Sequence, residues 1–497
     1  MKTLITLTYL SCFSFAFGQV TTTAILNQNN ASAEISDGGI FFTSGGSADP
    51  GYEIPAGSGI TSMFALTYWF GGTDVNGQRK MAIPLYGDQS DLFPGPLTVS
   101  SATPANWPTS LFPVTKAEID NHIANYLTVG YVVPSSIANW PAHGDVSLGF
   151  DYYLAPFIDV DTDGNYSPSS GDYPCILGDK AVYVINNDKG NVHASGADPI
   201  GIEVHTMFYQ YNTTDDINNV TFAQVRVINR GTQTLFDYRM SVFADTDIGN
   251  YTDDYMGTDS VRNMMFAYNG DGFDEDFAGY LGYGNMPPAI GVMSLDHDLT
   301  NARSYASMST PGDYMTAMLT PGYDFPGNPY TLVGDSEESN ANTTGDRKMF
   351  YTISPGDLLP GDTYYHNYAV MFSRADTNRL QNVNQLYNIA DEVQLFYDTN
   401  LDGVCVEDPL LTVAESTLEH FEIYPNPTSG IFTLNLSGME MSQQLEITDV
   451  LGNIVQFQLL AGGNEELKLE LNAPDGVYFI RILHGNEVSV AKLILSK

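Results

Sequence analysis

Positive charge is scarce in this chain, whose 497 residues include 19 Lys and Arg against 59 Asp and Glu, a formal net charge of −40 at pH 7. A protein with this charge repels phosphate backbones and anionic lipid headgroups. The composition therefore excludes nucleic acid as a partner and disfavours binding to anionic membrane surfaces. Most of the acidic residues are Asp, whose short carboxylate favours turns, helix caps and cation-binding loops.

Long apolar segments are also missing. The one extended apolar run, 4–17, follows Met1 and Lys2 and ends next to Gly18. It is too short to span a bilayer, and its basic start and small-residue end are typical of a secretory signal peptide. We therefore expect a signal peptide over 1–18 and, because no later run approaches eighteen apolar residues, no transmembrane segment.

Cysteine is rare, with three residues in the chain, and Cys12 lies in the predicted signal peptide. The mature chain keeps Cys175 and Cys405. An isolated pair in an exported protein predicts one disulfide. It would close a loop of about 230 residues and stabilise the fold by about 5 kcal/mol or less in the chain-entropy model.

Apolar periodicity divides the mature chain into two main regions. Residues 19–178 are a mixed β and loop region, in which a capping box at Thr115 and Glu118 predicts a short helix over about 115–128. Within 179–398, several segments alternate apolar and polar residues, which is typical of an antiparallel β-sandwich. One of them, 222–245, is similar to an immunoglobulin-type hairpin.

A second helix is predicted over about 377–397, where apolar residues recur on one helical face. The acidic stretch 399–418 is expected to be a linker, and 419–497 a separate small β-sandwich. The predicted fold class is therefore mostly β, with antiparallel β-sandwich domains, long Asp- and Gly-rich loops, two helices and a small C-terminal sandwich.

The strongest chemical signal is the segment Asp159-Val-Asp161-Thr-Asp163-Gly164. Three carboxylates at alternate positions can converge on one hard cation if the chain curls, and Gly permits the tight turn. An EF-hand would place Glu at loop position twelve, where this chain has Ser, and Asp172 lies two residues beyond. The spacing predicts a calcium loop of a non-EF type, and a solvated Asp-rich turn is the alternative.

A second candidate for a calcium site begins with Asp245 and Asp247, at the end of a predicted strand. Asp253, Asp254 and Asp259 follow and could complete this site or the first one. The alternative is solubilising charge in a loop. In either site the expected role of Ca²⁺ is structural, because a cation would lock loops whose carboxylates otherwise repel each other.

No catalytic motif is present: the chain has no GxSxG, no Cys–His nucleophile context and no Walker loop. Glu203 and His205 share a strand face and could bind zinc with His193 and Asp198, but the compact spacing of zinc sites is missing. We interpret them as hydrogen-bonded strand-face residues. The remaining isolated histidines are His143, His297 and His366.

The C-terminal block consists of alternating apolar segments bounded by turn residues, in the motifs FEIYPNPTSGIF, LEITDVLGNIV and DGVYFIRILHG. It resembles the type A C-terminal sorting domain of the type IX secretion system of Bacteroidetes. The positions that mark the sorting signal are Pro425, Asn426, Pro427, Gly430, Asp449, Gly452, Gly476 and Lys492. The resemblance implies export through the periplasm to the outer cell surface or the medium, with the secretion machinery and its sorting protease as partners.

Residues 20–417 also resemble secreted Bacteroidetes proteins that carry this domain, in motifs such as YLAPFIDVDTDGNYSPSSGDYP and ADTDIGNYTDDYMG. That resemblance supplies no catalytic residue. We therefore expect a calcium-stabilised structural or binding component, with a glycan or another surface molecule as its ligand. The alternative is an exported glycan-active hydrolase that uses a pair of carboxylates.

Overall fold

The computed structural model describes residues 22–45, 49–84, 90–97, 110–305, 308–322, 335–339, 341–405, 422–435, 443–448, 454–460, 466–474, 476–484 and 487–496. The predicted signal peptide lies outside these residues, as does most of the predicted linker. The chain divides into two compact units, Met1–Pro409 and Leu410–Lys497. The first is called the main unit here, and the second the C-terminal unit.

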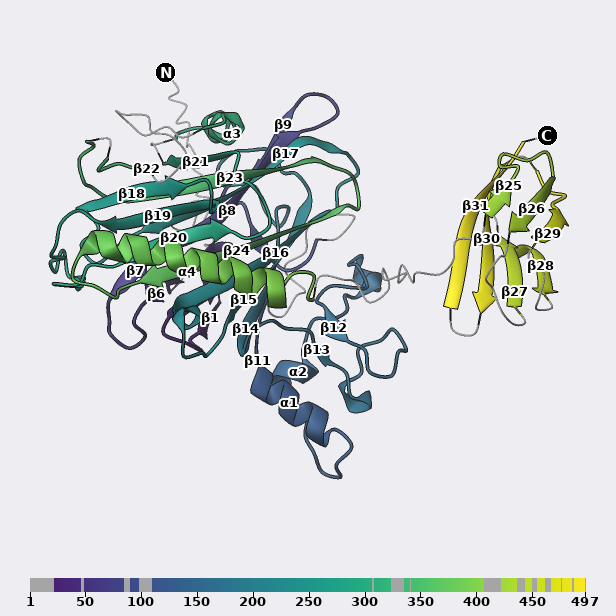
Figure 1. The fold of residues 1–497 in the computed structure, drawn as a ribbon, viewed down its shortest axis with the longest axis horizontal. Helices are drawn as coiled ribbons and strands as arrows, with labels where there is room; N and C mark the ends of the chain where they lie inside the picture. The colour runs from purple at the N-terminus through teal and green to yellow at the C-terminus, as the bar shows by residue number, and fades with distance from the viewer. Residues whose placement is uncertain are drawn as a thin grey trace, which may run out of the picture. The chain divides into compact units, whose positions relative to one another are not determined.

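A ten-stranded sheet forms the centre of the main unit (Figure 1). Neighbouring strands in it pair antiparallel. The strands, in spatial order, are β10 (Phe93–Pro94), β14 (Lys180–Asn187), β15 (Ile202–Gln210), β16 (Val220–Asn229), β24 (Thr363–Ser373), β20 (Ala289–Ser294), β19 (Met264–Asn269), β18 (Asp254–Asp259) and β22 (Asp335–Ser336), with β11 (Leu111–Thr115) also paired to β14.

A six-stranded sheet packs against the ten-stranded one. Its strands, in spatial order, are β21 (Asn301–Ser304), β23 (Arg347–Leu358), β17 (Leu235–Thr246), β8 (Ala65–Thr73) and β3 (Ile40–Phe41), with β9 (Arg79–Ala82) paired to β8. A smaller sheet holds β1 (Thr23–Leu26), β2 (Ser32–Ser36), β6 (Tyr52–Glu53) and β7 (Thr61–Met63), and β4 (Thr43–Ser44) pairs with β5 (Asp49–Pro50).

Strand alternation separates an inner core from an outer one. On β24, Tyr368, Val370 and Phe372 lie in the core between the sheets, whereas Ala369 and Met371 lie in the core on the opposite face. This period of two is the one expected for a strand with two buried faces. The predicted fold class, a mostly-β antiparallel sandwich, is confirmed.

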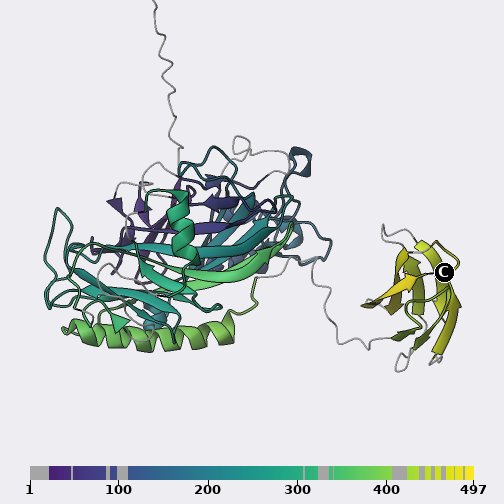
Figure 2. The ribbon, with the colours of Figure 1, turned by 90° about the horizontal axis from the view of Figure 1, so that it is seen from above.

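Helices cover the outer faces. The long helix α4 (Arg379–Asn400) lies along the outer face of the ten-stranded sheet (Figure 2), and it contacts β24 and β20. It buries Val383, Leu386, Ala390 and Val393, as the helical spacing predicts, but Leu380 is exposed. The helix confirms the prediction and continues past the expected end.

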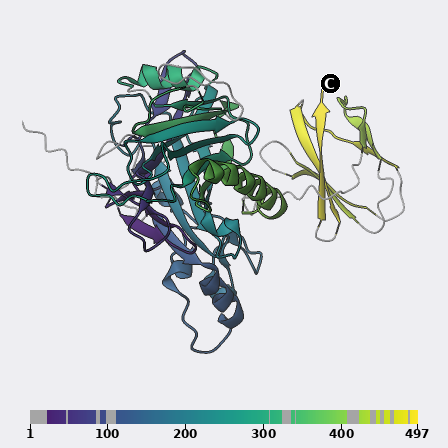
Figure 3. The same ribbon diagram turned by 60° about the vertical axis from the view of Figure 1, so that its left-hand side comes forward.

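The helices α1 (Lys116–Asn125) and α2 (Ser135–Ala138) project from the sheets of the main unit (Figure 3). The predicted capping box of α1 is confirmed, because the Thr115 and Glu118 side chains each accept a hydrogen bond from the other residue's backbone N–H. Besides the two expected helices, the structure contains α2 and α3 (Pro311–Leu319), and α3 packs on β17 and β8. Thr310 and Asp313 form its capping box, a signal that was present in the sequence.

The expected immunoglobulin-type hairpin over 222–245 is wrong. β16 pairs with β15 and β24 in the ten-stranded sheet, whereas β17 pairs with β23 and β8 in the other sheet. The connection between β16 and β17 therefore crosses from one layer to the other. Both strands were predicted correctly, but the alternation of apolar and polar residues does not show with which other strands each of them pairs.

The predicted disulfide is present in the structure. Cys175 follows β13 (Tyr173–Pro174), Cys405 follows α4, and the two Cα atoms are 5.7 Å apart. The bond joins the end of the β12–β13 hairpin to the segment that follows α4, the longest of the described helices.

The C-terminal unit is a small sandwich of two antiparallel sheets. One holds β25 (Glu422–Tyr424), β26 (Ile431–Asn435) and β29 (Glu466–Glu470); the other holds β28 (Ile454–Leu460), β27 (Gln443–Thr448), β30 (Gly476–His484) and β31 (Glu487–Leu495). Its core includes Phe432, Leu445, Ile480 and Leu493.

Candidate metal sites

The Asp-rich segment 159–172 is the loop of a short hairpin formed by β12 (Phe157–Ile158) and β13. Thr162 and Gly164 adopt positive φ angles of 59° and 77°, so the chain curls back on itself. The Asp159 carboxylate accepts hydrogen bonds from the backbone N–H groups of Gly164 at 2.7 Å and Asp163 at 3.3 Å. The loop therefore has the curled form that the sequence predicts.

This curl brings Asp159, Asp161 and Asp172 together, with one carboxylate oxygen of each within 4.8 Å of the others. Asp172 is buried, and its oxygens accept the N–H groups of Val160 at 2.8 Å and Ser167 at 2.7 Å. Burial raises the pKa of Asp172, and the charges of Asp159 and Asp161 raise it further. A cation placed among the three oxygens would remove this repulsion.

Asp163, which the sequence included in this site, does not join the group of three. Its Oδ1 accepts the N–H of Asn165 at 2.7 Å, and the side chain is exposed. A residue outside the loop also fixes its conformation: His143 Nε2 accepts a hydrogen bond from the backbone N–H of Tyr166 at 2.9 Å.

A second group contains Asp245 and Asp247, which the sequence singled out, and Asp346, which it missed. One carboxylate oxygen of each lies within 4.8 Å of the others. Asp346 precedes β23, and the last pair of β17 with β23 is Thr246 with Arg347. Asp247 directly follows β17 and Asp346 directly precedes β23, so the two residues lie at the same end of the six-stranded sheet. No local sequence pattern indicates this arrangement.

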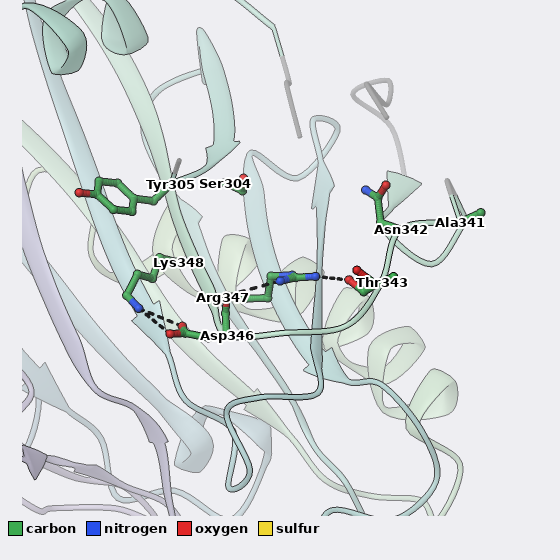
Figure 4. Close-up of a pocket in the computed structure, with 8 residues that line it drawn as sticks. All are labelled: Ser304, Tyr305, Ala341, Asn342, Thr343, Asp346, Arg347 and Lys348. Carbon is green, nitrogen blue, oxygen red and sulfur yellow. Dashed lines mark hydrogen bonds and ion pairs between the residues drawn. The ribbon is translucent and has the colours of Figure 1, made fainter. Parts of the chain in front are cut away.

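Burial raises the pKa of Asp247 to about 8, together with the charges of Asp245 and Asp346. Lys348 is the cation beside this group: its Nζ lies 2.8 Å from Asp346 Oδ2 and 3.8 Å from Asp245 Oδ2. Asp346, Arg347 and Lys348 also line a cavity of about 420 Å³ (Figure 4). A metal ion here would compete with the Lys348 ammonium for the same carboxylates.

The other Asp residues of this segment lie apart from that group. Asp259 pairs with Arg262 at 2.7 Å. Asp254 is fully buried; its Oδ2 accepts the N–H of Ile248 at 3.2 Å, and its Oδ1 has no hydrogen-bond partner among the described residues. Burial raises the pKa of Asp254, with contributions from Asp253 and Asp274.

A third group consists of Asp296, His297 and His366. It was not predicted from the sequence, in which the two histidines are isolated. Asp296 Oδ1 lies 2.6 Å from His297 Nδ1 and 2.9 Å from His366 Nδ1. Asp296 Oδ2 accepts the backbone N–H of Asn367 at 2.7 Å, at a point of β24 where β20 has ended. The carboxylate therefore replaces a strand partner, and its hydrogen bonds to the two histidines indicate a structural role.

Glu203 and His205 lie on β15, buried on the outer face of the ten-stranded sheet. Glu203 Oε1 accepts from His205 Nε2 at 2.8 Å and from Arg230 Nη2 at 2.9 Å, and Oε2 accepts the N–H of Leu97 at 2.7 Å. His193 instead lies 3.5 Å from Asp91, and Asp198 pairs with Lys80. Glu203 and His205 are therefore the hydrogen-bonded strand-face residues that we expected, whereas His193 and Asp198 lie before β15 and do not join them.

In the C-terminal unit, Asn426 fastens the sorting motif to the last strand. Its Nδ2 donates to Lys492 O at 2.6 Å, and its Oδ1 accepts the N–H of Ile494 at 2.9 Å. Gly430, with a φ of 135°, accepts the N–H of Leu471 at 2.8 Å. Pro425 and Pro427 follow cis peptide bonds, and Gly476 begins β30. Asp449 and Gly452 lie outside the described residues.

The fold and the sites define a mostly-β protein with acidic groups that could hold metal ions and a separate C-terminal sandwich. Residues 422–496 match the secretion system C-terminal sorting domain. This match shows export to the cell surface or secretion from the cell, with the secretion machinery as a partner. None of the described helices is long and apolar enough to span a membrane.

No curated protein matches the chain. Among solved structures, a polysaccharide lyase aligns at 8% identity over 59% of this chain and 34% of that chain, with a TM-score of 0.20. A putative aldose 1-epimerase from Escherichia coli K12 aligns at 10% identity over 71% and 100% of the chains, with a TM-score of 0.24. Dimeric latent PorU from Porphyromonas gingivalis aligns at 13% identity over 63% and 31%, with a TM-score of 0.14. The alignment spans about a third of the lyase, and scores this low carry no functional argument.

Proposed function

We propose that the exported main unit is a calcium-stabilised structural or binding component. Calcium would bind in the 159–172 loop and at the group of Asp245, Asp247 and Asp346. The observation that carries the proposal is the meeting of Asp159 and Asp161 with the buried Asp172. Oxygen ligands on a curled loop suit Ca²⁺, and extracellular millimolar calcium makes sites of modest affinity useful.

The position of the first loop explains why calcium would stabilise the fold. The loop closes the β12–β13 hairpin, and Cys175 follows directly. A cation there would fix the hairpin to which the end of α4 is covalently joined. At the second group, the cation would hold the end of β17 to the start of β23 and replace the Lys348 ammonium.

Thermal unfolding of the mature protein in calcium chloride and in EDTA tests this function. The melting temperature should be several degrees higher in calcium, because a ligand that binds only the folded state stabilises it. Magnesium chloride at the same ionic strength is the control for general screening, and it should give a smaller shift. Equal melting temperatures in calcium and EDTA would contradict the proposal.

The second candidate function is a glycan-active hydrolase. It is favoured by two carboxyl groups, Asp253 and Asp274, that interact electrostatically and both have raised pKa values. Burial, with the charges of Asp274 and Glu275, raises the pKa of Asp253 to about 7, and burial raises that of Asp274 to about 6. Such values suit a general acid at neutral pH. A screen of oligosaccharide substrates, with Asp253→Asn as the inactive control, tests this function.

A further inference from the structure

A tight hairpin with aromatic residues at its tip projects from the ten-stranded sheet between β19 and β20. Two pairs of reciprocal backbone hydrogen bonds hold it, between Asp274 and Gly284 and between Phe277 and Tyr280. The two turn residues, Ala278 and Gly279, both have positive φ, at 52° and 98°. This is the two-residue turn whose twist suits a β-hairpin, so the tip has a defined shape.

Apolar side chains on this hairpin face solvent. Phe273 is 45% exposed, Phe277 41% and Leu281 47%. Tyr251, from the loop after β17, lies edge-on to Phe277 with ring centroids 5.6 Å apart, and to Tyr280 at 6.4 Å. Three rings from two segments therefore meet at the tip, where Phe277 is exposed and Tyr251 and Tyr280 are half-buried. Scattered single apolar residues are the ordinary pattern on a protein surface.

The rings are bordered by negative charge that the chain does not neutralise there. The Tyr280 hydroxyl lies 3.5 Å from Asp49 Oδ1, and Asp271 and Glu275 are exposed on the hairpin. Residues 270–284 contain no Lys or Arg. Among the described residues, no ion pair involves Asp49, Asp271 or Glu275.

Elsewhere in the main unit, the same combination of a ring and a carboxylate holds an arginine. Arg379 lies 5.5 Å from the centre of the Tyr268 ring and forms two hydrogen bonds of 2.8 Å with Glu338. Arg262 lies 5.2 Å from the centre of the Tyr387 ring and pairs with Asp391 at 2.8 Å. A guanidinium is suited to both contacts at once, since it stacks on rings and forms bonds in its plane.

We propose that the tip formed by Tyr251, Phe277 and Tyr280 with Asp49 and Glu275 binds an arginine-rich segment of another protein. The charge of the chain favours a basic partner, and the rings add a contact that charge alone does not provide. A neutral sugar would stack on the rings but would leave the carboxylates uncompensated. This inference does not depend on the calcium sites.

Binding of a fluorescent peptide of alternating arginine and glycine to the mature protein tests the inference, by anisotropy in calcium-containing buffer. The same peptide with citrulline, which keeps the shape without the charge, is the ligand control. The wild type should bind the arginine peptide and not the citrulline peptide. Phe277→Ser should weaken binding about fivefold, the loss expected for one exposed cation–π contact.

The chain offers matched control variants. Phe236, on β17, is 41% exposed like Phe277, so Phe236→Ser should leave the affinity unchanged. Glu275→Gln should weaken binding, whereas Glu392→Gln, at an exposed position of α4, should not. Tyr251→Ser is a second tip variant in case Phe277→Ser fails to fold, as the melting temperature will show.

Three results would overturn the inference. Wild-type affinity in both tip variants would show that the peptide responds only to net charge. Equal binding of the citrulline peptide would show that no cation is recognised. Binding of a neutral oligosaccharide that Phe277→Ser abolishes, with no binding of the arginine peptide, would assign the tip to a glycan.

Discussion

Asp346 lies opposite Asp247 at the end of the β17–β23 pair, where the two residues and Asp245 form one group of carboxylates. Three carboxylates so close together repel one another, and burial strengthens the effect. Burial first, and then the charges of Asp245 and Asp346, raise the pKa of Asp247 to about 8.

The first prediction is a pH dependence of the calcium-free protein. Since the folded-state pKa of Asp247 is raised, its contribution to stability is full below the ordinary Asp pKa of about 4 and is lost as pH rises towards 8. The melting temperature in EDTA should therefore fall between about pH 5 and pH 8. Asp247→Asn should flatten this slope, and an unchanged slope in the variant would assign the effect to other groups.

The second prediction separates the two neighbouring Asp residues of the 159–172 loop. Asp161→Asn removes a carboxylate from the group with Asp172 and should abolish the part of the calcium-induced rise in melting temperature that this loop contributes. Asp163→Asn should keep most of that shift, because Asp163 lies outside the group. Calorimetric titration with calcium checks both variants, and an equal loss in both would show that the geometry of the group is wrong.

The third prediction concerns the buried ion pair of Glu203 with Arg230. Burial would raise the pKa of Glu203, but the charge of Arg230 and the hydrogen bond and charge of His205 outweigh it and lower the pKa to about 2. Glu203→Gln should destabilise the main unit by about 3 kcal/mol, because it leaves a buried cation with less compensation. Denaturant unfolding measures this, with the exposed Glu392→Gln as the neutral control.

The contribution of the Glu203–Arg230 pair to stability should also depend on pH in the acid range. A lowered folded-state pKa gives stability that is present above the ordinary Glu pKa of about 4.3 and is lost as pH falls towards 2. Wild type and Glu203→Gln should therefore converge in stability at acid pH. A constant difference across this range would contradict the assignment.

The fourth prediction tests the disulfide. Cys175→Ser combined with Cys405→Ser should lower stability by about 5 kcal/mol or less, because the crosslink restricts a long loop in the unfolded chain. Protein purified without reductant should show no free thiol by mass spectrometry after alkylation. Two alkylated cysteines would show that the bond does not form in solution.

The fifth prediction concerns export. Asn426→Ala removes both bonds from the sorting motif to β31 and should reduce the fraction of protein found in the medium or at the cell surface of the native host. Glu470→Gln, at an exposed position of the same unit, is the control. Secretion of Asn426→Ala at the wild-type level would show that the motif is recognised without this contact.

Local sequence signals predicted local structure well. The Thr115 and Glu118 capping box, the long amphipathic helix and the strand alternation depend on neighbouring residues, and the structure confirms them. Asp346 and the partnership of Asp296 with His366 depend on strand register between distant segments, which single-sequence periodicity does not contain. The wrong hairpin over 222–245 has the same cause, since two adjacent strands can enter different layers.

The bond between Cys175 and Cys405 has a mechanical consequence. Cys405 lies near the C-terminal end of the main unit, so tension applied to the chain from the C-terminal side reaches this bond before it reaches α4. Peeling α4 from its sheet would require the bond to break. With the disulfide formed, the main unit therefore resists unfolding from its C-terminal end. Force applied through the sorting domain would then move the main unit without unfolding α4.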